Sequence, residues 1–160
     1  IDRWVTDQLL MGLFRQAMEW ENARDAIKNG WTLARIIHDS TPIPFFVRFG
    51  WPFIVQRVGF VRRFGNRVDR SEPLPDMRDR QRRELLHHLG DGPFLGCRNR
   101  VSLADLSAYT AIVTSHLIGM QRGSNFLEDP EVLAWCRRVQ THLPTNPLVV
   151  PDHLLKRRHP

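Results

Sequence analysis

Residues 92–106 read GPFLGCRNRVSLADL, a loop that leads directly into the start of an apolar helix. Ser102 has the place of an N-cap, with its hydroxyl accepting from the backbone N–H of Asp105 while the Asp105 carboxylate accepts from the N–H of Ser102. Val101 and Leu106 flank this capping box as a hydrophobic staple. The carboxylate also faces the positive end of the helix dipole. We therefore interpret Ser102 and Asp105 as structural residues that start a central helix.

Outside this motif, the spacing of apolar residues also predicts helices. Apolar side chains recur at three- and four-residue steps from residue 2 onwards, and Gly30 is expected to end the first helix. Asp129 and Pro130 have the N-cap and N1 places of a late helix. No segment alternates polar and apolar residues as a half-buried strand does, so the predicted fold class is all-α. The predicted helices are residues 2–29, 31–39, a segment starting near Pro52, 76–89, 102–119 and 130–143.

The length and cysteine content predict one intracellular domain. The chain has 160 residues and a mass of 18.7 kDa, enough to bury a core without disulfides or metals. Cys97 and Cys136 provide no disulfide framework, so a reduced, cytoplasmic location is expected. The chain opens on Ile1 without a signal peptide, and we expect it to be part of a longer protein.

The net charge of +6 is concentrated in two places, an arginine-rich middle and a basic tail over residues 148–160. Residues 41–75 form an atypical aromatic and arginine-rich insertion within a helical domain that we place at residues 1–147. Arginines break the apolar run of this insertion well short of the roughly 20 residues that span a membrane. Two interpretations remain: its aromatics fold back onto the bundle, which we favour, or it forms a peripheral membrane contact. Nucleic acid is not an expected partner, because no known binding module is present.

Two regions carry a resemblance to a known family. The Phe94-Leu95 turn followed by Ser102-Leu103-Ala104-Asp105, together with the late segment from Asp129 to Trp135, resembles the C-terminal helical domain of the glutathione S-transferase superfamily. The resemblance covers residues 76–147 well and residues 1–40 loosely. It implies an all-α glutathione S-transferase C-terminal-like helical bundle.

The resemblance also implies where the chemistry lies. In this superfamily glutathione binds a thioredoxin-like domain that precedes the helical one, and that domain is absent from these residues. The helical domain supplies the wall of the pocket for the apolar co-substrate, which on this chain points to Trp4, Met11 and Phe14, with Arg15 as a polar neighbour. The alternative, which apolar residues at helical spacing favour, is that these side chains pack the core or a domain interface.

No catalytic residue or metal ligand is predicted on this chain. The adjacent His87 and His88 point to different sides of a helix and cannot chelate one ion together. The first functional hypothesis is the helical half of a homodimeric glutathione transferase, with glutathione and a small apolar electrophile as its substrates. The second is a non-catalytic scaffold that binds proteins or lies on a membrane surface.

Overall fold

The computed structural model forms two compact units, Ile1–Leu13 with Asp69–Pro160 and, separately, Phe14–Val68. The residues that the structure describes are 1–18, 23–40, 44, 46, 47, 50, 67, 69–119, 124–143 and 155–160. Their secondary structure is helical, and no strand occurs among them; one isolated bridge joins Phe94 to Arg98. The all-α prediction is therefore confirmed for the described part of the chain.

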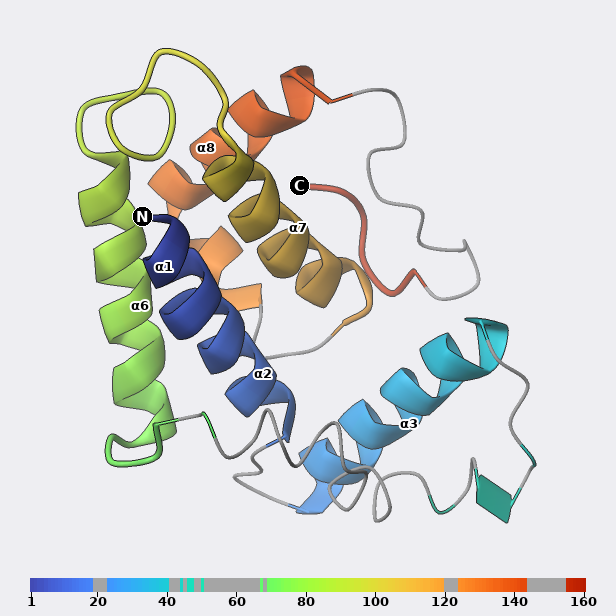
Figure 1. The fold of residues 1–160 in the computed structure, drawn as a ribbon. Helices are drawn as coiled ribbons and strands as arrows, with labels where there is room; N and C mark the ends of the chain where they lie inside the picture. The colour runs from blue at the N-terminus through green and yellow to red at the C-terminus, as the bar shows by residue number, and fades with distance from the viewer. Residues whose placement is uncertain are drawn as a thin grey trace. The chain divides into compact units, whose positions relative to one another are not determined.

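The first unit is built from helices, two of which are joined by a long loop over residues 90–102 (Figure 1). The chain starts with one helical turn, widens into a π-helix and then returns to α-helical geometry. In Figure 1 this run lies beside α6, and hydrogen bonds from Trp4 and Gln81 join the two. The elements are α1 (Asp2–Trp4), η1 (Val5–Leu10), the beginning of α2 (Met11–Met18), α6 (Leu74–Leu89), α7 (Leu103–Leu117), η3 (Ser124–Glu128) and α8 (Pro130–Thr141).

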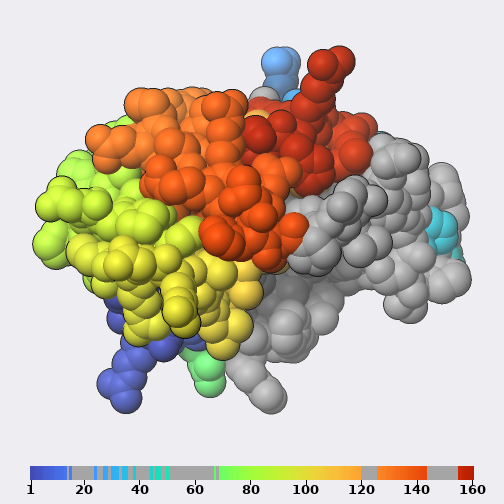
Figure 2. Space-filling model, turned by 90° about the horizontal axis from the view of Figure 1, so that it is seen from above, coloured from blue at the N-terminus to red at the C-terminus, as the bar shows by residue number. Residues whose placement is uncertain are grey.

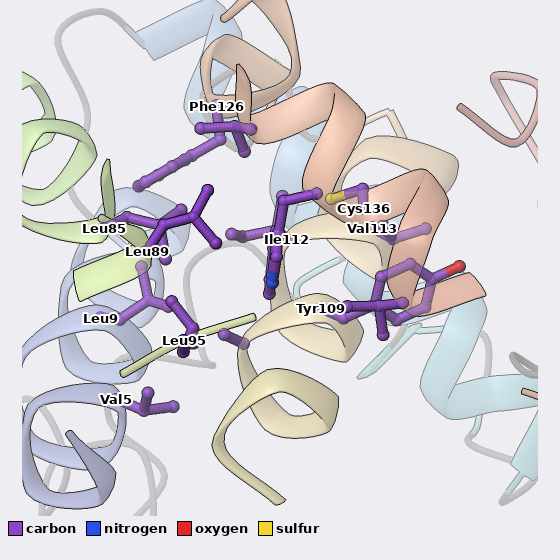
Figure 3. Close-up of a cluster of buried hydrophobic side chains, with 14 of the residues drawn as sticks. Val5, Leu9, Leu85, Leu89, Leu95, Tyr109, Ile112, Val113, Phe126 and Cys136 are labelled. Atoms are coloured by element: carbon purple, nitrogen blue, oxygen red, sulfur yellow. The ribbon is translucent and has the colours of Figure 1, made fainter. Parts of the chain in front are cut away.

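Helix α7 lies at the centre of this unit, as its nearly all-round apolar sequence predicts. Its buried residues meet side chains from η1, α6, the 94–95 turn, η3 and α8 in one cluster (Figure 3). Both staple residues, Val101 and Leu106, pack against this cluster. The fully buried side chains of the cluster include Leu9, Leu85, Leu95, Tyr109, Ile112, Val113, Leu117, Phe126, Val132, Trp135 and Cys136.

Several predicted helix boundaries differ from the structure. Helices α7 and α8 end at Leu117 and Thr141, each two residues before the predicted end. Helix α6 begins at Leu74, two residues earlier than expected, because Pro75 fits the first turn of a helix and need not lie in the preceding loop. Gly30 does not end a helix but lies inside α3 (Ala23–Ser40). A glycine in a helix interior destabilises the helix by about 1 kcal/mol. The helical turns on both sides of Gly30 offset that cost. The Thr32 hydroxyl also donates to the carbonyl of Lys28 across this glycine, at 2.9 Å.

The second unit contains α3, where Ala34 is buried while Trp31 is exposed. Most of the 41–75 insertion, including the helix expected near Pro52, lies outside the described residues. Phe46, which is described, has 74% of its surface exposed. Among the helices that the structure describes, none combines the length and the hydropathy needed to cross a bilayer.

Candidate functional site

Asp105 is a fully buried carboxylate that joins three parts of the first unit. Its Oδ2 accepts from the N–H of Ser102 at 2.9 Å, and Ser102 Oγ accepts from the N–H of Asp105 at 3.4 Å, so both bonds of the expected capping box are present. The Ser102 hydroxyl also donates to Oδ2, at 2.5 Å. Oδ1 accepts from the N–H of Leu95 and from Trp135 Nε1, each at 2.9 Å. We call these four residues the Asp105 hub.

The hub is a structural site rather than a catalytic one. Burying a carboxylate is costly unless hydrogen bonds replace its water. Here the donors are two backbone N–H groups, a hydroxyl and an indole, and the first turn of α7 adds its dipole. With both oxygens engaged and no exposure, the carboxylate has no route to a substrate. The sequence pattern identified the cap, but the bonds to Leu95 and Trp135 are tertiary and leave no local signal.

Trp4, the first of the predicted pocket residues, faces α6. Its Nε1 donates to Glu84 Oε2 at 2.7 Å, and its ring meets the His88 ring edge-on at 4.7 Å between centroids. Arg80 bridges Glu84 and Glu72 with contacts of about 3.0 Å to each. Burial opposes the charged form of Glu84, but the hydrogen bonds from Trp4 and Arg80 outweigh it and hold the pKa of this carboxyl below its usual value.

The π-helix η1 is held against α6 by Gln81, a buried residue that the sequence analysis did not single out. Gln81 Nε2 donates to the carbonyl oxygen of Gln8 at 2.7 Å. The amide also fills the space beside Gly12, where an added Cβ would lie 1.9 Å from Gln81 Nε2. A side chain at position 12, in the first turn of α2, would therefore displace the Gln81 amide from this place. π-Helical turns are rare and occur often at functional sites, which draws attention to the surface beside η1.

That surface carries an apolar groove of about 400 Å³, formed by Leu10 of η1 and by one face of α7. The α7 residues lie at helical spacing and include the small side chains Ser107, Thr110 and Ala111, which leave the space open. Leu103, one turn before this face, has 77% of its surface exposed. The groove is completed by Leu106. The groove is shallow and open to solvent, and its apolar lining can contact one face of a small apolar molecule or an apolar side chain of a partner.

Two of the predicted pocket residues, Trp4 and Met11, do not line this groove. Trp4 is turned to Glu84, and Met11 is half-buried one residue beyond Leu10. Phe14 and Arg15 belong to the second unit, where Arg15 is buried and the Phe14 side chain is not among those described. The role of these residues in substrate binding stays a prediction.

A second groove, also of about 400 Å³, lies between the turn after α6 and one face of α8. It carries both signs of charge, from Asp91 and Glu131 on one hand and Arg138 on the other. Arg138 Nε donates to the carbonyl oxygen of Pro93 at 3.1 Å, which ties the turn to α8. This contact gives the arginine a structural role.

Two buried ionisable groups of the core, Tyr109 and Cys136, remain neutral near pH 7. Burial raises the pKa of the Tyr109 hydroxyl to about 12, and burial also raises the pKa of the Cys136 thiol to about 12. Neither group is reachable by a substrate, since both are fully buried.

Within the described ranges, no group of three or more His, Cys, Asp or Glu side chains is arranged to hold a metal ion. Comparison of the chain with protein-family models, with curated proteins and with solved structures finds no match.

Proposed function

We propose that this chain is the helical domain of a glutathione S-transferase-like protein. In that role it forms the wall of the apolar co-substrate pocket and part of a homodimer interface. The reaction is the conjugation of glutathione to a small apolar electrophile: the thiolate sulfur forms a bond to the electrophilic carbon and a leaving group departs. Glutathione binds a thioredoxin-like domain that would precede Ile1, and the helical domain desolvates and orients the acceptor.

The observation that carries this proposal is the Asp105 hub. The motif positions behind the family resemblance are the Phe94-Leu95 turn, the Ser102 and Asp105 cap, and Trp135. Three of these sites meet at one carboxylate. This shared contact supports the resemblance, because a motif is expected to contain the residues that are joined by one network of hydrogen bonds. The groove beside η1 is the pocket wall that we assign to the co-substrate, in place of the positions expected from the sequence.

The test uses the protein encoded by the whole gene. We expect it to be retained on immobilised glutathione, to elute with free glutathione, and to conjugate glutathione to an electrophilic aryl chloride. Thr110→Glu places a charge in the groove and is expected to raise the KM for the aryl chloride about tenfold while retention is unchanged, an effect of about 1.4 kcal/mol. Thr141→Glu, an exposed threonine on α8, is the matched control.

Glutathione binding and the effect of the groove variant can fail separately, and each failure has its own meaning. A full-length protein that does not bind glutathione removes the enzyme proposal. If glutathione binds but Thr110→Glu and Thr141→Glu behave alike, the pocket wall lies elsewhere.

A non-catalytic docking module is the second candidate. The exposed Leu103 beside the apolar groove, and Phe46 in the second unit, are large apolar side chains at the surface that could contact a partner. Liposome co-sedimentation tests its membrane form, with Arg57, Arg62 and Arg63 all replaced by Glu. Binding that the replacement does not weaken, or no binding by either protein, contradicts a membrane contact made by the insertion.

A further inference from the structure

Residues 155–160 lie against the C-terminal end of α7, on the surface of the first unit (Figure 2, red). The N–H of Lys156 donates to the carbonyl oxygen of Leu117 at 2.7 Å, and the N–H of Arg157 donates to the same oxygen at 3.3 Å. Leu155 packs against the buried cluster. The last carbonyl groups of a helix lack partners within the helix, so this segment supplies a cap from elsewhere in the chain.

Gly119 leaves the space that this contact needs. An added Cβ at Gly119 would lie 2.8 Å from the Cβ of Lys156, and the φ angle of 73° at this position also favours glycine. The end of α7 is therefore shaped to receive the segment.

His116, in the last turn of α7, makes the second attachment. Its Nε2 lies 3.2 Å from the carbonyl oxygen of Arg158, and its Nδ1 lies 3.5 Å from Nη1 of Arg157. A carbonyl oxygen only accepts, so Nε2 must carry a proton in order to donate to it. A guanidinium only donates, so Nδ1 must be unprotonated to accept from it. The neutral Nε2–H tautomer is the one form of the ring that satisfies both contacts.

The surroundings of the ring also favour the neutral form. Burial lowers the pKa of His116 below its usual value of 6.5, and the nearby positive charges of Arg157 and His159 lower it further. The hydrogen bond to the Arg158 carbonyl acts in the opposite direction. Among the described residues, Arg157 and His159 are the charged or titratable groups that act on this ring, and both lie on the attached segment.

We propose that residues 155–160 form a strap that is attached to α7 while His116 is neutral and is released when the His116 ring is protonated. The released ring gains a proton more readily than the attached one. Attachment is therefore complete above pH 6.5 and weakens as the pH falls below that value. Release frees the Leu117 carbonyl and uncovers the part of the core under Leu155. The inference is independent of the proposed catalytic role.

Nuclear magnetic resonance of the labelled chain tests this strap with two signals. The ring nitrogens of His116 report the tautomer, and the exchange protection factor of the Lys156 amide reports attachment. At pH 7.5 we expect the Nε2–H tautomer and a protected amide. Below pH 6.5 the protection factor should fall by up to about tenfold per pH unit, until the attached form is itself protonated.

The matched variants separate this switch from general acid unfolding. His116→Gln keeps a donor for the Arg158 carbonyl and does not titrate, so the pH step at Lys156 should disappear. His159→Gln should keep it. A Lys156 amide that exchanges at the free-peptide rate at every pH overturns the proposal. The Nδ1–H tautomer at pH 7.5, or a ring that titrates without any change at Lys156, also overturns it, and both readouts come from the unmodified chain.

Discussion

Two tryptophans of the first unit each donate their indole N–H to a carboxylate, and the two pairs have opposite surroundings. Trp135 donates to Asp105, which is fully buried and receives its other bonds from uncharged groups. Trp4 donates to Glu84, which is half-buried and is also paired with Arg80. Asp105 is stabilised by fixed dipoles in place of water, whereas Glu84 is stabilised by the Arg80 cation and by solvent.

The difference predicts where the fold is sensitive. Removing one member of a buried, hydrogen-bonded network leaves its partners without water or bonds, and that costs more than the bond itself contributes. At a half-exposed ion pair, water replaces the lost partner, and the expected cost is below about 1 kcal/mol. The Asp105 side of the unit should therefore tolerate substitution poorly and the Glu84 side well.

The largest effect is expected for Asp105→Ala. The change removes the cap of α7 and leaves the N–H of Leu95 and Trp135 Nε1 buried without an acceptor, for a loss of about 3–5 kcal/mol in the free energy of unfolding. Urea denaturation measures it. Asp129→Ala removes the cap of α8 at a less buried position and should cost about 1 kcal/mol. Equal losses of stability in the two variants would contradict the greater sensitivity expected for the buried Asp105 network.

The two tryptophans give the next test. Trp135→Phe keeps most of the buried ring but leaves Asp105 Oδ1 with one donor fewer, so we expect a loss of about 1.5–3 kcal/mol. Trp4→Phe should cost less than about 1 kcal/mol, because Arg80 and water still solvate Glu84. Thermal unfolding of the two variants side by side measures the difference. A larger loss for Trp4→Phe would show that the contact with α6 is the more important one.

A third prediction concerns the contact between η1 and α6. Gly12→Ala improves helix propensity by about 1 kcal/mol. It should nevertheless destabilise the protein by about 1 kcal/mol, because the new Cβ displaces the Gln81 amide from the Gln8 carbonyl. In a Gln81→Ala background the same change should stabilise. A double-mutant cycle measures this reversal of sign, and additive effects would contradict the assigned packing.

The smallest effect is expected at Arg80. Arg80→Gln should lower stability by about 0.5 kcal/mol at low salt and by less in 1 M salt, which screens the pair. The pKa of Glu84 is lowered in the folded state, so its contribution is present above the usual value of 4.5 and is lost as the pH falls through the folded pKa. Denaturation between pH 7 and pH 3 measures that slope. A slope unchanged in Trp4→Phe and in Arg80→Gln would mean that these two groups do not set the pKa.

Local patterns predicted the starts of α7 and α8. Ser102 and Asp129 both cap helices in the structure, because a cap is a contact between residues two or three positions apart. The central place of α7 followed from its high content of apolar residues. Gly30 was wrong as a helix end, since a propensity of about 1 kcal/mol is readily overridden by the residues around it.

The candidate sites were predicted less completely. The sequence predicted only part of the Asp105 hub. Ser102 and Asp105 lie in one turn, whereas Trp135 lies 30 residues after Asp105. Neither Gln81 nor His116 carried any pattern in the sequence, since each acts through a carbonyl oxygen of a distant segment. Every residue has a backbone carbonyl oxygen, so the residue type does not show which carbonyl will accept the bond.

The sequence alone therefore determined that the described part of the chain is helical, where α7 and α8 begin and which helix is buried. Those properties depend on contacts within one or two turns and on the balance of polar and apolar residues. Only the tertiary structure decided which oxygen of Asp105 meets Trp135, that η1 is a π-helix held by Gln81, and that His116 faces the 155–160 segment. These depend on how segments far apart in the chain are packed, and the free energy of that packing is shared among many residues.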